Sequence, residues 1–135
     1  MHTRNINKFI RMVAFDTHGL VPAVIQDAKD NTVLMAAYMN KQSLRVSLKE
    51  GKTCFWSRSR KTLWRKGETS GNRQIIKAIH IDCDGDCILF KVRQIGNAAC
   101  HTGYHSCFFK QTGKTGALKV SGKKIFDPKK VYRTK

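Results

Sequence analysis

The stretch that decides the fold is Arg73–Gln94, which reads RQIIKAIHIDCDGDCILFKVRQ. Apolar residues, several of them β-branched, fill both halves, and such runs bounded by turn residues are typical of strands. Between the halves stands Asp84-Gly85, a dipeptide common in tight hairpin turns. The pattern therefore predicts two antiparallel strands, Arg73–Cys83 and Cys87–Gln94.

The segment before this hairpin predicts further strands and one helix. Asn40 can cap a helix that runs to Glu50, and Gly51 is a suitable terminator. Ser59–Asn72 is basic and contains glycine, so it reads as a long loop. Three more segments have strand character: Val21–Gln26, Thr32–Tyr38 and Thr53–Arg58.

This order of elements predicts an α+β fold, with a mostly antiparallel sheet and one main helix. A last short strand is expected to end at Phe108 and Phe109. The length of 135 residues suits one domain, and so small a core often gains from dimerisation. We expect an N-terminal extension over residues 1–19, the domain over 20–110, and a basic, partly flexible tail over 111–135.

The chain is strongly basic, with 26 lysine and arginine residues, nine acids and a formal net charge of +17. Such a field attracts polyanions, either nucleic acid or phosphorylated metabolites, although surface drift unrelated to function is an alternative. No run approaches the length of a membrane span, and Met1–Phe15 lacks the apolar stretch of a signal peptide. A soluble, cytoplasmic protein is expected.

The first motif with chemical potential is DCDGD at residues 82–86. In an extended chain its three aspartates would share one face and Cys83 would occupy the other. Carboxylates suit magnesium and a thiolate suits zinc, so one segment could serve two metals. An EF-hand loop requires Gly and Glu at its sixth and twelfth positions, where this chain has Cys87 and Arg93. A polar hairpin turn without metal is the alternative.

The second motif is ACHTGYHSCF at residues 99–108, in which Cys100 and Cys107 stand seven apart. With Cys83 they would supply three thiolates and leave a fourth position for water, the pattern of a catalytic zinc site. Buried free thiols are equally consistent with the spacing. Five cysteines in a chain without a secretion signal do not suggest a disulfide framework.

The third motif is FWSRSRKTLWRKGETSGN at residues 55–72, which interleaves arginine, tryptophan, hydroxyl and glycine residues. Guanidinium groups form bidentate hydrogen bonds with phosphate, and aromatic or guanidinium planes stack on bases. The composition fits a site for a phosphorylated nucleotide. Binding of single-stranded RNA is the alternative.

Taken together, the three motifs resemble the phosphoribosyl-AMP cyclohydrolase family in order and spacing. With a weaker match in LVPAVIQDAKDNTVLMAAYMN at residues 20–40, the resemblance spans about Leu20 to Phe109. It implies a monofunctional, metal-dependent enzyme of histidine biosynthesis. In that reaction, zinc-activated water attacks C6 of the adenine ring of phosphoribosyl-AMP and the N1–C6 bond opens.

The resemblance also implies site residues and an intertwined homodimer. His101 corresponds to the family's candidate general acid and base, and Cys83 is expected to come from the opposite subunit. The implied zinc ligands are Cys83, Cys100 and Cys107. The implied magnesium ligands are Asp82, Asp84 and Asp86.

Residue type alone suggests the groups that hold the substrate. The basic residues would bind the two phosphates, Trp64 or Trp56 would stack on the base, and Glu68 would orient a ribose hydroxyl or support a basic neighbour. The predicted set is Arg58, Arg60, Trp64, Lys66, Glu68 and Arg73. The competing function is a basic, zinc-containing RNA-binding module without catalysis. The expected partners are the phosphorylated nucleotide and a second copy of the chain, with no membrane and, despite the charge, no nucleic acid.

Overall fold

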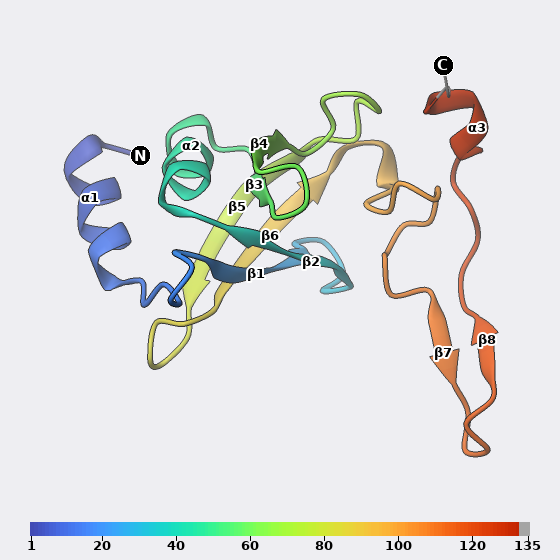
Figure 1. Cartoon of the computed structure of the whole chain (residues 1–135). Coiled ribbons are helices and arrows are strands. Elements are labelled where there is room, and N and C mark those ends of the chain that lie inside the picture. The colour runs from blue at the N-terminus through green and yellow to red at the C-terminus, as the bar shows by residue number, and fades with distance from the viewer. Residues whose placement is uncertain (133–135) are drawn as a thin grey trace.

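A computed structural model describes residues 1–132 and places a four-stranded sheet at the centre of the chain (Figure 1). The strands lie in the order β2-β1-β6-β5. Both outer pairs are antiparallel, whereas the two central strands pair in parallel. The bounds are β1 Val21–Asp27, β2 Val33–Met39, β5 Gln74–Ile81 and β6 Ile88–Gln94. The α+β class and the mostly antiparallel pairing are therefore confirmed.

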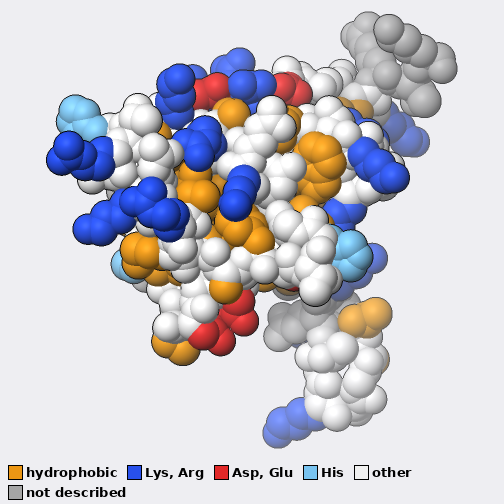
Figure 2. All heavy atoms as spheres, turned by 60° about the vertical axis from the view of Figure 1, so that its left-hand side comes forward, with side chains coloured by type: hydrophobic (Ala, Val, Ile, Leu, Met, Phe, Trp, Pro, Cys, Tyr) orange, Lys and Arg blue, Asp and Glu red, His pale blue; other side chains and the backbone are white. Residues whose placement is uncertain are grey.

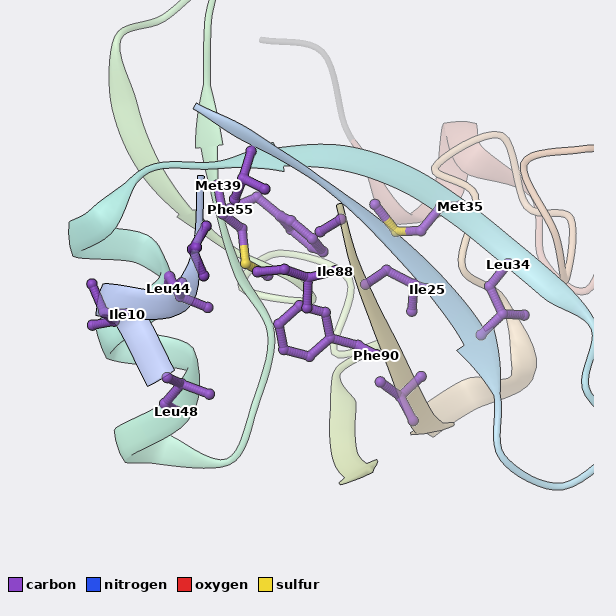
Figure 3. Close-up of a cluster of buried hydrophobic side chains, with 14 of the residues drawn as sticks. Ile10, Ile25, Leu34, Met35, Met39, Leu44, Leu48, Phe55, Ile88 and Phe90 are labelled. Atoms are coloured by element: carbon purple, nitrogen blue, oxygen red, sulfur yellow. The ribbon is translucent and has the colours of Figure 1, made fainter. Parts of the chain in front are cut away.

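The two central strands carry the core. Alternate residues of β1 are buried, from Val21 to Asp27, and β6 shows the same period of two from Ile88. Because successive side chains of a strand point to opposite faces, this alternation directs one face of the sheet inward. Phe90 from β6 and Ile25 from β1 are fully buried there (Figure 3).

The predicted helix is present as α2, Lys41–Glu50. The side chain of Asn40 accepts a hydrogen bond from the Ser43 amide at 2.8 Å, and the Ser43 hydroxyl accepts one from the Asn40 amide at 2.9 Å. This reciprocal pair is a capping box. Gly51 ends the helix in the left-handed region, with φ of 71°.

A second ten-residue helix, α1 at Thr3–Met12, corrects the prediction of one main helix. Its Ile6 and Ile10 lie four residues apart and are buried in the same hydrophobic cluster as the sheet and α2. The segment is mostly polar, so its helical signal is weak without the packing that covers this stripe. None of the helices within residues 1–132 has the length and apolarity that crossing a membrane requires.

The predicted loop Ser59–Asn72 is wrong in its first part. Residues Thr62–Arg65 form β4, which pairs antiparallel with β3, Cys54–Ser57. Four residues of strand among basic neighbours give too short an alternation to recognise locally. Lys61 turns the chain between the two strands with φ of 51°.

The predicted strand ending at Phe108 and Phe109 is also wrong. Residues 98–109 form an irregular loop, in which the Cys107 amide donates to the Leu34 carbonyl of β2 at 2.7 Å and the Ala99 amide donates to the His105 carbonyl at 2.9 Å. These isolated bonds satisfy backbone groups without forming a continuous ladder with a strand. We call residues 98–109 the thiol loop.

The C-terminal segment contains regular elements. A hairpin of β7, Lys110–Thr112, and β8, Leu118–Val120, projects from the sheet (Figure 1), and α3 spans Pro128–Val131. The chain then returns to the thiol loop, where the Ile125 amide donates to the Gly103 carbonyl. The last residues of the predicted tail, 133–135, lie outside the described part of the chain.

The surface matches the composition. Figure 2 shows lysine and arginine side chains spread over the face that carries α1, with few acidic side chains between them. A face of this kind favours anionic ligands of any size.

Candidate active site

A cavity of about 330 Å³ lies between the β3–β4 hairpin and the thiol loop. It brings together residues that are distant in the sequence, including four of the six predicted substrate-binding residues. The predicted site residues that line it are Arg60, Trp64, Lys66, Glu68, His101 and Cys107.

The β3–β4 hairpin holds the wall that carries Trp64. Trp64 pairs with Phe55 across the strands, and their ring centroids are 5.2 Å apart. Phe55 is fully buried, so the core fixes the position of the tryptophan. After the hairpin, Gly67 adopts φ of 85°, and a Cβ there would lie 2.6 Å from the amide nitrogen of Arg73. Only glycine allows this close approach of two backbone segments.

Lys66 is the one buried lysine among the residues that the structure describes, with 7% of its surface exposed. Its ammonium lies 5.7 Å from the centroid of the Trp64 ring. Burial lowers the pKa of Lys66, and the nearby thiols of Cys107 and Cys100 oppose that shift. A cationic group in this position is suited to an anionic ligand in the cavity.

Cys100 and Cys107 lie together at the base of the thiol loop. Burial, and then the neighbouring Cys100, raise the pKa of the Cys107 thiol to about 12. Cys107 as a whole retains solvent exposure, but its side chain faces the cavity wall formed with Lys66. The Cys107 thiol resists ionisation because it is buried and because Cys100 lies beside it, and a bound dication would remove that resistance. The donor chemistry fits zinc.

His101 follows Cys100 directly and lines the same cavity as Cys107. Its side chain is exposed to the solvent in the cavity mouth. The imidazole therefore shares one cavity with Lys66 and Trp64 and stays accessible to solvent.

The three predicted magnesium ligands gather in the turn between β5 and β6. One carboxylate oxygen of each lies within 4.8 Å of the others. The three aspartates meet for a reason different from the predicted one. Residues 82–87 form a turn around Gly85, with φ of 77°, and not an extended chain with alternating side chains. Asp82 and then Asp84 raise the pKa of Asp86 to about 6. Three crowded carboxylates of this kind fit a hard divalent cation.

Cys83 belongs to that same turn and is exposed. The turn precedes β6, whereas Cys100 and Cys107 follow β6. The seven-residue strand therefore separates Cys83 from the other two cysteines by roughly 20 Å. Figure 1 shows the β5–β6 turn at the opposite end of the sheet from the thiol loop. Within one chain, the three predicted zinc ligands do not meet.

Comparison with known proteins agrees with the motifs. The sequence profile of the phosphoribosyl-AMP cyclohydrolase family matches residues 35–109, which contain most of the cavity lining, the aspartate turn and the thiol loop. The chain belongs to the phosphoribosyl-AMP cyclohydrolase family.

Curated relatives named phosphoribosyl-AMP cyclohydrolase align over nearly the whole chain. The protein of Chlorobium chlorochromatii is 49% identical over 95% of this chain and 93% of its own length. That of Chloroherpeton thalassium is 53% identical over 93% and 89%, and that of Desulfotalea psychrophila 55% over 87% and 91%. The likeness to the family thus extends beyond the Leu20–Phe109 span that the motifs indicated.

Two predicted substrate-binding residues lie outside the cavity described above. Arg58 stacks over the Tyr38 ring, 4.2 Å from its centroid, and lines an adjacent hollow of about 440 Å³ with Trp56. Arg60 lines both spaces. Arg73 is exposed and lines neither of them, because the Gly67 turn directs its segment back toward β5.

The structure adds cavity residues that sequence reasoning missed. Tyr132, directly after α3, and Met35, from β2, both line the cavity beside His101 and Cys107. Neither carries a local signal, since Tyr132 stands in a lysine-rich segment and Met35 in an ordinary apolar strand. Only the return of the C-terminal segment across the thiol loop brings Tyr132 to the site.

Proposed function

We propose that the protein hydrolyses the adenine ring of 1-(5-phosphoribosyl)-AMP, opening the bond between N1 and C6, as a step of L-histidine biosynthesis. The observation that carries the proposal is a cavity lined by the Cys107 thiol, with Cys100 beside it, together with an imidazole, a buried lysine and a tryptophan, in a member of this family. The imidazole, the lysine and the tryptophan each have a counterpart in the substrate, namely a site of proton transfer, a phosphate and a purine, and the thiols would hold the metal.

We propose Cys100 and Cys107 as zinc ligands, with Cys83 of the partner subunit as the third. Three thiolates leave one coordination position free, as in catalytic zinc sites. Zinc, when bound, lowers the pKa of a water molecule toward neutrality and so supplies the nucleophile.

The residues of the chain would handle the proton and the substrate. Water adds its oxygen to C6, the N1–C6 bond breaks, and N1 needs a proton. His101, which lines the cavity, would accept the proton of the attacking water and return it to N1. Trp64 presents an aromatic face on which the purine can stack. Lys66 and Arg60 would bind phosphate, which provides the anionic partner for the buried ammonium.

We propose magnesium for the aspartate turn. The crowding of Asp82, Asp84 and Asp86 within 4.8 Å of one another supports a cation there, and oxygen-only ligation favours a hard ion. Within one chain, this site would lie at the end of the sheet opposite the thiol loop. Across a dimer interface, it would approach the thiol loop of the partner together with Cys83.

We propose a homodimer for the same reason. Cys83 and the thiol pair lie at opposite ends of β6, so a two-fold pairing that apposes these ends would complete two identical sites. The intertwined arrangement and the cytoplasmic location stay predictions.

The non-catalytic RNA-binding alternative makes a different prediction. It requires a closed zinc site with four protein ligands and binding that weakens steeply with salt. Membership of an enzyme family argues against it, although the charge of +17 does not.

The test is ring opening of phosphoribosyl-AMP followed by ultraviolet absorbance. We expect turnover by the zinc-loaded protein, loss of turnover after a thiol-competing chelator, and recovery when zinc is restored. Dialysis against magnesium-free buffer, with the zinc content checked as unchanged, serves as the control for the second site. Absence of turnover by zinc- and magnesium-loaded protein would contradict the proposed function.

A further inference from the structure

A third group of potential metal ligands lies apart from the cavity and from the aspartate turn. It comprises Asp27 at the end of β1, Asp30 in the β1–β2 turn, and His105 in the thiol loop. One ligand atom of each lies within 4.8 Å of the others. Residues separated by 75 positions in the sequence thus converge on one point.

Backbone amides donate a hydrogen bond to one oxygen of each of the two carboxylates. Asp27 Oδ1 accepts a hydrogen bond from the Lys29 amide at 2.8 Å, and Asp30 Oδ1 accepts one from the Thr32 amide at 2.9 Å. The second oxygen of each carboxylate is left for another ligand. Asp27 continues the inward-facing series of β1, and only 10% of its side chain is exposed. A cationic partner stabilises a carboxylate that is largely withdrawn from water.

His105 is oriented to provide a nitrogen ligand. Its Nδ1 lies 2.7 Å from the Asn97 carbonyl, which can only accept, so Nδ1 carries the hydrogen. Nε2 then faces Asp27 Oδ2 at 3.6 Å, too far for a good hydrogen bond. No other hydrogen bond reaches Asp27 Oδ2 within residues 1–132. A histidine whose second nitrogen donates to a backbone carbonyl is the usual arrangement behind a metal ligand.

We propose that Asp27, Asp30 and His105 bind a divalent transition-metal ion at a site separate from the zinc and magnesium sites proposed above. Two carboxylates neutralise the charge of the ion, and a neutral imidazole completes a mixed oxygen and nitrogen donor set. Such a set suits Mn²⁺ and ions near it in hardness better than the thiol pair does.

The bound ion would join the β1–β2 turn to the thiol loop. His105 lies between Tyr104 and Ser106, and Ser106 already donates from its hydroxyl to the Val33 carbonyl at 2.6 Å. The metal would therefore reinforce an existing contact and steady the segment that carries Cys100, His101 and Cys107. The rival is a metal-free pair of protonated His105 with Asp27.

The test counts bound Mn²⁺ by the electron paramagnetic resonance signal of the free ion, in zinc-loaded full-length protein. The parent for the series is Asp84→Asn, which weakens the aspartate turn as a competing site. We expect this parent to bind one Mn²⁺ per chain. Adding His105→Asn should weaken that binding by at least about 10- to 100-fold, since it removes a direct ligand. The matched control, His80→Asn, removes an exposed imidazole of β5 and should bind as the parent does.

Two results would overturn the proposal: no Mn²⁺ bound by the Asp84→Asn parent at millimolar concentrations, or equal binding with and without His105. The first would favour the metal-free ion pair. Asp27→Asn gives a second variant should His105→Asn not fold, and circular dichroism checks each protein. Because no arm measures turnover, failure here is independent of the proposed enzymatic function.

Discussion

At the scale of single residues, the site combines groups whose ordinary ionisation is disturbed by neighbours. Burial lowers the pKa of Lys66, while burial and Cys100 raise that of Cys107. Both pKa shifts favour the neutral form of the side chain. A charged ligand would reverse each of them: phosphate for Lys66 and a dication for Cys107. His101 lines the same cavity and is exposed, and it is the residue proposed above for proton transfer.

Replacement of His101 by asparagine should slow catalysis without removing the metal. Asparagine can still form hydrogen bonds but cannot carry a proton, so kcat should fall by about 10²- to 10⁴-fold with a much smaller change in KM. Steady-state kinetics and zinc analysis measure both effects. His80→Asn is the control. Loss of zinc in His101→Asn would make the residue a ligand or a structural group.

Replacement of Cys107 by alanine should abolish stoichiometric zinc and turnover together. Two remaining thiolates hold the ion far less tightly than three. Metal content by atomic absorption checks the change. Cys87→Ala removes a half-buried thiol outside the predicted ligand set and should keep zinc. A Cys107→Ala protein that retains one zinc per chain would refute the ligand assignment.

At the scale of elements, turns and helix faces position the chemistry. The β5–β6 turn gathers three aspartates because Gly85 reverses the chain and its carbonyl accepts from the Ala14 amide at 2.8 Å. The segment directly after α1 therefore supports the aspartate turn, while α1 itself packs into the core.

In the turn, Asp84→Asn should raise the magnesium concentration needed for half-maximal turnover. One of three anionic ligands is lost, while the zinc ligands are untouched. Magnesium titrations of activity, beside zinc analysis, make the measurement. An unchanged magnesium requirement would show that this turn is not the functional magnesium site.

In α1, Ile10→Ala should lower the free energy of unfolding by about 2–5 kcal/mol, because the side chain is 5% exposed and its removal leaves a cavity. Urea denaturation followed by circular dichroism checks this value. Met12→Ala, at an exposed position of the same helix, should change stability little. Equal stability of the two variants would mean that α1 does not belong to the cooperative unit.

At the scale of the whole molecule, one chain holds all the predicted ligands but does not bring them together. The thiol pair and Cys83 lie at opposite ends of β6. A second copy is the simplest source of the missing thiolate, and a two-fold axis would complete both sites at once.

Mixing two inactive variants tests this arrangement. After subunit exchange between Cys83→Ala and Cys107→Ala, each hybrid dimer has one site with all three thiols. Its other site lacks both Cys83 and Cys107. About one quarter of wild-type activity is expected, since half of the dimers are hybrids. Mass spectrometry confirms the exchange. No recovery after proven exchange would place each zinc site within one chain.

Much of the fold and of the candidate site could be predicted from the sequence, because the interactions that determine these parts are local. The Asn40 cap and Gly51 terminator predicted α2, and the apolar runs on either side of Asp84-Gly85 predicted the β5–β6 hairpin. The three motifs identified the family, since metal and phosphate chemistry demand particular residue types at short spacings.

Tertiary structure decided what depends on contacts between distant segments. The parallel pairing of β1 with β6, the docking of α1, and the return of Tyr132 to the cavity have no local signal. Packing also separated Arg60, which lines the cavity, from Arg73, which does not. Side chains of the same type differ here because burial and neighbours, set by the fold as a whole, determine what each can bind.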